Sequence, residues 1–270
     1  MKSKTKKILS GVCLGAIMAT TPLFAGCTSD ITFNQGDLDK ALVNINEYLE
    51  TQNNYNSDFA KNCLMNYLID GANSTSNTTN FSVTYSYKEC DETGREIDGY
   101  SYKEKTKQQG NTTVSEVQYN NTVRFQEVEF NQETKKYKST TYENDKSYSV
   151  SENLDTINYI SQFTSSVQFY KLVLDMCNGD CSMFTMDTLE DGSEVFKTYK
   201  IENYTNEKGP NSVISCFTIK FKEQKLVNLQ ITEIDEFLPG NIINSYQIEN
   251  YDIEYNIPDI QINKSQYTKA

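Results

Sequence analysis

The stretch "FSVTYSYK", residues 81–88, decides the fold class. Apolar or aromatic residues occupy every second position, and Ser, Thr or Lys fills the positions between them. Because successive side chains of a strand point to opposite faces of a sheet, this alternation predicts a strand with one buried and one wet face. "DETGREIDG" then predicts a turn, and "YSYKEK" from Tyr100 predicts the returning strand of a hairpin.

Further segments of the same character predict a large antiparallel sheet. Further strands are expected at 113–119, 122–130, 136–142, 146–150, 194–202, 212–222, 226–236 and 245–257. In the last of these, Tyr246 and Ile248 are out of phase with Tyr251 and Ile253, which predicts a bulge near Glu249 or Asn250. Since the loops are short, sequential antiparallel pairing is the simplest topology.

Apolar residues at helical spacing predict helices at 37–50, 57–69 and 154–176. In the second, Phe59, Cys63, Leu64 and Tyr67 lie on one side. A sheet with one apolar face needs a covering layer, and amphipathic helices supply it. The expected fold is therefore α+β: a large curved antiparallel sheet, or half-barrel, covered by an N-terminal helix and a long central helix.

The N-terminus has the pattern of an export signal. Lysines at positions 2, 4, 6 and 7 precede an uncharged stretch over 8–25. The sequence "LFAGC", residues 23–27, resembles the lipobox of bacterial lipoproteins, although Phe24 stands where that family usually has Leu. The resemblance implies that Cys27 is acylated and becomes the first residue of a protein anchored at the extracytoplasmic face of the cell membrane. An ordinary secretory peptide or a retained helix is the alternative.

These patterns divide the chain into four parts. Residues 1–26 are predicted to be a lipoprotein signal peptide, and 27–36 a lipidated tether. Residues 37–262 are predicted to form the sheet domain, and 263–270 a flexible tail. Two or more acyl chains on Cys27 would give a stable anchor, because a single chain holds only marginally.

Composition excludes several classes of function. The net charge is −12, and removal of the lysine-bearing leader makes the remaining chain more acidic, which disfavours nucleic acid as a partner. The chain has no His, so Ser-His-Asp and Cys-His catalytic pairs cannot form. The acidic stretch "TEIDEF" places Glu233 and Asp235 on one face of a strand, which we interpret as a solvated edge rather than a catalytic pair. We expect no enzyme activity, no cofactor and no metal site.

The order of the predicted elements, the lipobox and the C-terminal stretch "YNIPDIQI" resemble the LolA-like family of extracytoplasmic lipoproteins and lipoprotein carriers. In that family the concave face of the sheet and its helices enclose an apolar cavity for acyl chains. The resemblance implies a lipid or other hydrophobic ligand between helix 154–176 and the sheet. The candidate lining residues are Ile160, Val167, Leu174, Phe217 and Ile219.

A second hypothesis is a surface interaction or adhesion module with a solid core and no small-molecule ligand, whose acidic sheet meets a protein or a glycan. An apolar pocket under the long helix would favour the first hypothesis, and a packed core the second. Tyr85, Tyr87, Tyr100 and Tyr102 could be a ligand-facing aromatic surface or the half-buried side of a hairpin, and we favour the latter.

The cysteines allow one local pairing. In "CNGDC" the three residues between Cys177 and Cys181 could turn the chain enough for the two thiols to form a disulfide. The nearby "DTLEDG", residues 187–192, resembles the start of a calcium loop but has Leu189 at a ligand position, so we interpret it as an acidic turn.

Overall fold

The computed structural model describes residues 57–74, 79–93, 95–177, 181–207, 209–237 and 242–270. The predicted signal peptide, the tether with Cys27 and the helix over 37–50 lie outside these residues. The described elements are α3 (Ser57–Ser74), β1 (Phe81–Asp91), β2 (Glu96–Gln109), β3 (Thr112–Tyr119), β4 (Thr122–Asn131), β5 (Lys136–Tyr142), β6 (Ser147–Leu154), α4 (Ser166–Cys177), β7 (Ser182–Thr188), β8 (Glu194–Asn206), β9 (Gly209–Lys222), β10 (Lys225–Phe237), β11 (Ile242–Tyr255), η2 (Lys264–Gln266) and β12 (Thr268–Lys269).

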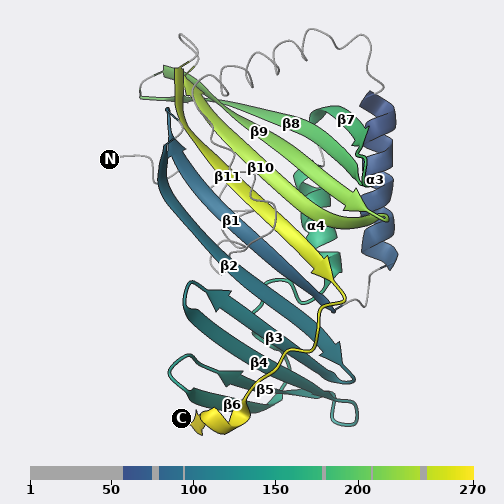
Figure 1. Ribbon diagram of the computed structural model, residues 1–270, viewed down its shortest axis with the longest axis vertical. Coiled ribbons are helices and arrows are strands. Elements are labelled where there is room, and N and C mark those ends of the chain that lie inside the picture. The colour runs from purple at the N-terminus through teal and green to yellow at the C-terminus, as the bar shows by residue number, and fades with distance from the viewer. Residues whose placement is uncertain (1–56, 75–78, 94, 178–180, 208, 238–241) are drawn as a thin grey trace.

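The strands form one curved 12-stranded sheet in the order β12-β6-β5-β4-β3-β2-β1-β11-β10-β9-β8-β7. All neighbours are antiparallel except β12 and β6. The expected α+β class with a large antiparallel sheet is therefore confirmed. Two meanders, β1–β6 and β7–β11, are joined by the pairing of β1 with β11. In Figure 1 the strands β3–β6 extend away from the two helices.

One side of the sheet, called here the helix-facing side, carries the main core. Phe81, Val83, Tyr85 and Tyr87 alternate onto this side of β1 and are all buried, as the sequence pattern predicts. The other face of β1 was predicted to be wet, but Ser82 and Thr84 are only 1% exposed, because side chains of the neighbouring strands cover them. The same core contains side chains from β9, β10 and β11 and from both helices. Burial of these large apolar side chains contributes about 1.5–3 kcal/mol each to the free energy of folding.

Helix α3 buries the stripe formed by Ala60, Leu64 and Leu68, which recur every four residues. Phe59, predicted to lie on the buried side, is 57% exposed. The rest of the predicted side is packed: Leu64 is fully buried, and Cys63 and Tyr67 pack against the same core. Phe59, in the first turn of α3, is therefore the one predicted residue that lies outside the packed face.

The long helix predicted over 154–176 is only half formed, because α4 begins at Ser166. Residues 155–165, called here the crossing segment, are bonded to side chains of the sheet instead. The Ile160 amide donates to Gln126 Oε1 (3.1 Å), and the Gln162 and Phe163 amides donate to the Glu104 carboxylate (both 3.0 Å). These sheet side chains replace the carbonyl partners that a helix would have supplied.

The crossing segment connects the two meanders across the helix-facing side. It starts beyond β6, where Asp155 pairs with Lys136 of β5 (2.5 Å). It next contacts Gln126 of β4, and then Thr106 of β2, whose hydroxyl donates to Ser161 (3.1 Å). The chain thereby passes from the β6 edge to α4 and on to β7, at the opposite edge of the sheet.

The out-of-phase residues of β11 belong to a second apolar cluster on the outer side of the sheet. Tyr246 is buried there with Cys90, Ile214 and Ile234, and Ile248 packs against this cluster. Pairing of β11 with β1 is continuous through Glu249 and Asn250, so the predicted bulge is wrong. The register of β11 shifts instead against β10, where Asp235 pairs with Ser245 and Glu236 with Ile243, so the extra residue is in β11 at position 244.

The C-terminal residues predicted to be a flexible tail are docked on the sheet. Thr268 and Lys269 pair in parallel with Ser147 and Tyr148 of β6. The Tyr267 ring packs edge-on against Tyr142, with 5.1 Å between centroids. The polar composition of residues 263–270 does not indicate this aromatic contact, because the partner ring, Tyr142, is far away in the sequence.

Candidate functional site

The predicted ligand-lining residues come from three different environments. Phe217 and Ile219 lie on β9 within the main core, and Ile219 is fully buried. Leu174 and Val167 are half-buried on α4, and Ile160 is half-buried in the crossing segment. The residues of α4 that face the core are a different set, namely Ser166, Phe169, Tyr170, Val173 and Cys177.

Aromatic side chains fill the space between α4 and the sheet. The Phe169 ring lies 5.5 Å from the Tyr251 ring and 5.1 Å from the Phe163 ring, measured between centroids. The Tyr170 hydroxyl accepts a hydrogen bond from the Leu226 amide (2.9 Å). A Cβ placed on Gly71 of α3 would lie 2.0 Å from the Tyr170 ring, so this glycine makes room for the ring. The described contacts between helices and sheet are therefore those of a packed core.

Three tyrosines of the helix-facing side donate to glutamates two residues away on the same strand. The hydroxyls of Tyr87, Tyr102 and Tyr251 lie 3.0, 2.8 and 3.0 Å from their acceptors. The acceptors are Glu89, Glu104 and Glu249. Tyr85, Tyr87 and Tyr102 are buried, and Tyr100 is half-buried with its ring 5.3 Å from that of Tyr87. The tyrosine line is thus the buried side of a hairpin, as the sequence analysis favoured.

Two of these carboxyls, Glu104 and Glu249, are buried and have raised pKa values. Burial raises the pKa of Glu104 to about 7, although its hydrogen bonds from Tyr102, Gln162 and Phe163 act in the opposite direction. Burial likewise raises the pKa of Glu249 to about 7. Each carboxyl is held by hydrogen bonds inside the fold, which suits a structural role better than contact with substrate.

The acidic stretch at 232–237 lies inside the sheet and not at an edge, because β10 pairs with both β9 and β11. Glu233 accepts a hydrogen bond from Ser215 (3.3 Å), and Asp235 accepts one from Tyr204 (2.7 Å). Burial raises the pKa of Glu233. The two carboxyls therefore have separate partners, Ser215 on the adjacent strand β9 and Tyr204 on β8 beyond it.

Cys177 and Cys181 are both buried thiols at the end of α4 and just before β7. Cys177 is hydrogen-bonded to Cys181, and this contact and burial raise the pKa of Cys177 well above its ordinary value. The Cys181 thiol also donates to the Met176 carbonyl (3.5 Å). Their proximity is compatible with the predicted disulfide, which stays a prediction.

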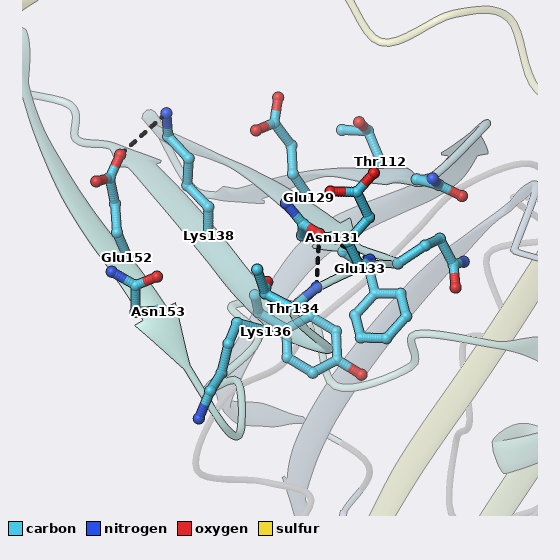
Figure 2. Close-up of a pocket in the computed structure, with 13 residues that line it drawn as sticks. Thr112, Glu129, Asn131, Glu133, Thr134, Lys136, Lys138, Glu152 and Asn153 are labelled. Atoms are coloured by element: carbon cyan, nitrogen blue, oxygen red, sulfur yellow. Dashed lines mark hydrogen bonds and ion pairs between the residues drawn. The ribbon is translucent and has the colours of Figure 1, made fainter.

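An open groove lies where β3, β4, β5 and β6 meet around the turn from β4 to β5, and we call it the hairpin groove (Figure 2). Its volume is about 630 Å³. The lining residues are Asn111, Thr112, Glu129, Phe130, Asn131, Gln132, Glu133, Thr134, Lys136, Tyr137, Lys138, Glu152 and Asn153. No pattern in the sequence predicts this site, because its residues come from separate hairpins and form no motif.

Within the part of the chain that the structure describes, no cluster of three or more His, Cys, Asp or Glu side chains has an arrangement that could hold a metal ion. The acidic turn over 187–192 is closed by its own hydrogen bonds, including one from the Ser193 amide to Asp191 (3.0 Å). Neither described helix combines the length and the apolar character needed to cross a bilayer.

Compared with models of known protein families and with curated proteins, the sequence matches none.

Proposed function

We propose that this chain is a lipid-anchored extracytoplasmic protein whose sheet domain is a non-enzymatic interaction module. The observation that carries the proposal is the packing between α4 and the sheet. Phe169 packs against Tyr251 and Tyr170 bonds to Leu226 of the sheet, and Val173, Phe217 and Ile219 are buried in the same core. Side chains that fill the core contribute to stability and leave the sheet and its loops to contact partners.

The lipobox-like sequence at 23–27 supports the anchor. Cys27 follows Gly26 at the end of the uncharged leader and precedes the polar residues Thr28 and Ser29. Acyl chains on this single thiol would hold a water-soluble domain at the membrane, since each buried methylene contributes about 0.8 kcal/mol. The absence of His from the sequence supports a role other than catalysis.

The anchor is tested by Cys27→Ser in the full chain, expressed in a bacterium that processes lipoproteins. We expect the variant in the aqueous fraction and the wild type in the membrane fraction. Ser29→Ala is the matched control, because it changes a neighbouring residue and keeps the thiol. Membrane residence of Cys27→Ser, or an intact leader in the mass of the wild type, would contradict the proposal.

A ligand-holding protein of the LolA-like type is the second candidate. The curved sheet with helices on one side supports it, because that shape suits the enclosure of an acyl chain. In this candidate a ligand would lie between α4 and the sheet, with Ile160, Val167, Leu174, Phe217 and Ile219 as lining residues.

Native mass spectrometry of the purified full chain distinguishes the two candidates. The interaction module predicts the mass of the acylated chain alone. Additional lipid that survives gentle ionisation, and that is lost in Phe217→Ala but retained in the exposed-site control Ile201→Ala, would favour the second candidate.

A further inference from the structure

We propose that the hairpin groove binds a neutral glycan. The groove is an open hollow of about 630 Å³, which is within the usual range of small-ligand sites. It lies in the β3–β6 part of the sheet, which extends away from the helices (Figures 1 and 2). This inference rests on the proposed function, because a protein on the extracytoplasmic face meets cell-surface and environmental glycans.

An aromatic pair supplies the apolar part of the groove. Phe130 and Tyr137 lie opposite each other on β4 and β5, with their ring centroids 4.8 Å apart and their planes at 44°. Both residues are half-buried, so strand packing fixes the rings. Lys135 Nζ lies 6.0 Å from the centroid of the Phe130 ring, so the Tyr137 ring is the one offered to a sugar. The C–H face of a pyranose ring packs on such aromatic surfaces, and the tyrosine hydroxyl adds a polar end.

Side-chain amides and hydroxyls make up much of the remaining lining. Asn111, Gln132 and Asn153 present amides, and Thr112 adds a hydroxyl. The side-chain oxygen of Asn131, Oδ1, accepts hydrogen bonds from the backbone amides of Glu133 and Thr134 (2.9 and 3.0 Å). These bonds fix the Asn131 side chain beside the groove (Figure 2). Each amide is both donor and acceptor, as the hydroxyls of a sugar require.

The charges of the groove disfavour anionic ligands. Lys138 pairs with Glu152 (3.1 Å) and Lys136 with Asp155 (2.5 Å), so both lysines are already engaged by carboxylates. Glu133, in the turn, adds negative charge and offers an acceptor for hydroxyl groups. Glu129 and Lys138 lie opposite each other on β4 and β5, on the other face of these strands from the aromatic pair. Phosphate, sulfate or nucleic acid would be repelled. An acyl chain would find no aliphatic side chain among the lining residues.

The test uses the full acylated chain in a detergent without a sugar headgroup, because such headgroups would compete for the groove. The probes are maltotetraose and tetra-N-acetylchitotetraose, with a sulfated oligosaccharide and tetralysine as charged controls. Saturation-transfer NMR identifies binding, and calorimetry gives the dissociation constant. We expect at least one neutral oligosaccharide to bind and the sulfated one not to bind.

Tyr137→Ala removes one ring of the pair, and we expect it to weaken binding about fivefold or more. Gln132→Ala with Asn153→Gly removes two amides and keeps the rings, and we expect a weakening of about threefold or more. Glycine suits position 153, where the backbone φ is 56°. Tyr119→Ala removes an exposed tyrosine outside the groove and should bind like the wild type.

Three results would overturn the inference: binding of neither neutral probe, equal binding by the wild type and both groove variants, or binding of a charged control alone. If Tyr137→Ala has no thermal unfolding transition, and so does not fold, the binding measured for the Gln132→Ala/Asn153→Gly variant is the test instead. Loss of glycan binding with Cys27-dependent membrane residence intact refutes this inference alone. Membrane residence without Cys27 refutes the proposed function.

Discussion

Glu104 is the residue that holds the crossing segment to the sheet. Its carboxylate accepts hydrogen bonds from Tyr102, Gln162 and Phe163, at 2.8, 3.0 and 3.0 Å, in a site that is 1% exposed. A buried carboxyl with three donors is satisfied, but removal of its acceptor atoms would leave two backbone amides without partners. One side chain thereby determines the path of a segment almost sixty residues later in the chain.

This environment predicts an unusual dependence of stability on pH. Burial raises the pKa of Glu104 to about 7, above its ordinary value of 4.5, so the folded state binds the proton more tightly than the unfolded state. The free energy of unfolding should therefore decrease as the pH rises from about 4.5 to about 7, by about 3 kcal/mol for this group. Glu249 should add to the decrease in the same window.

Urea unfolding of Glu104→Gln between pH 4.5 and 8 checks this expectation. The variant should be less stable than the wild type at pH 4.5, and its stability should decrease less steeply with pH. Glu190→Gln, which changes an exposed carboxyl in a turn, should reproduce the wild-type slope. A stability that rises through this pH window in the wild type would contradict the assignment.

The second prediction at the scale of single residues concerns the Cys177 and Cys181 thiols. After export to an oxidising compartment we expect them to form a disulfide, which would close a short loop and stabilise the fold by about 2 kcal/mol. Alkylation without reductant, followed by peptide mass analysis, should find both residues unmodified. Cys177→Ser should leave Cys181 alkylated after denaturation. Alkylation of both in the exported wild type would show that they remain reduced.

At the scale of elements, the crossing segment is where local pattern and tertiary contacts disagree. Ile157, Ile160 and Val167 have helical spacing, yet residues 155–165 are not helical. Isolated helical turns are marginal in water, so competing side-chain acceptors can decide the conformation. Gln126 is such an acceptor, and it also donates to the Asn158 carbonyl (2.9 Å).

We expect Gln126→Ala to destabilise the protein by about 2–3 kcal/mol, because three hydrogen bonds are lost and the Ile160 amide is left without its acceptor. Hydrogen exchange should become faster at Ile160 and Gln162, and it should change little in β9. Gln118→Ala is the control, because Gln118 is exposed on the adjacent strand β3. Unchanged protection at Ile160 in Gln126→Ala would show that other contacts hold the segment.

The outer cluster is a second case at this scale. Tyr246 and Ile248 break the alternation of β11, and a bulge is the local explanation of such a break. The structure has continuous pairing there and a second apolar cluster that covers part of the other face. A strand buried on both faces loses its alternation, because apolar residues are then favoured at successive positions.

At the scale of the whole molecule, β1 and β11 join two meanders into one sheet. Eleven residue pairs connect these strands, from Phe81 with Tyr255 to Asp91 with Ser245. The crossing segment links the same two halves on the helix-facing side. Since no boundary with few contacts separates the halves, we expect the described residues to unfold as one unit.

Ile219→Ala tests this expectation. Ile219 is fully buried on β9, and its truncation should reduce the free energy of unfolding by about 2–4 kcal/mol. Tyrosine fluorescence and the hydrogen exchange of β4, in the other meander, should report the same shift of the urea midpoint. Ile201→Ala, at a site that is 43% exposed, should change stability by less than about 0.5 kcal/mol. Separate transitions would show that the meanders unfold independently.

The sequence by itself determined the fold class and most of the strands. Alternation such as that of residues 81–88 depends only on which side chains prefer water, and this preference is local. Only the tertiary structure decided five other features. They are the non-helical path of residues 155–165, the outer cluster, strand β7, the docked C-terminus and the hairpin groove. Each depends on residues far apart in the chain, such as Gln126 with Ile160 or Tyr142 with Tyr267. A local pattern carries no information about such partners until the sheet has brought them together.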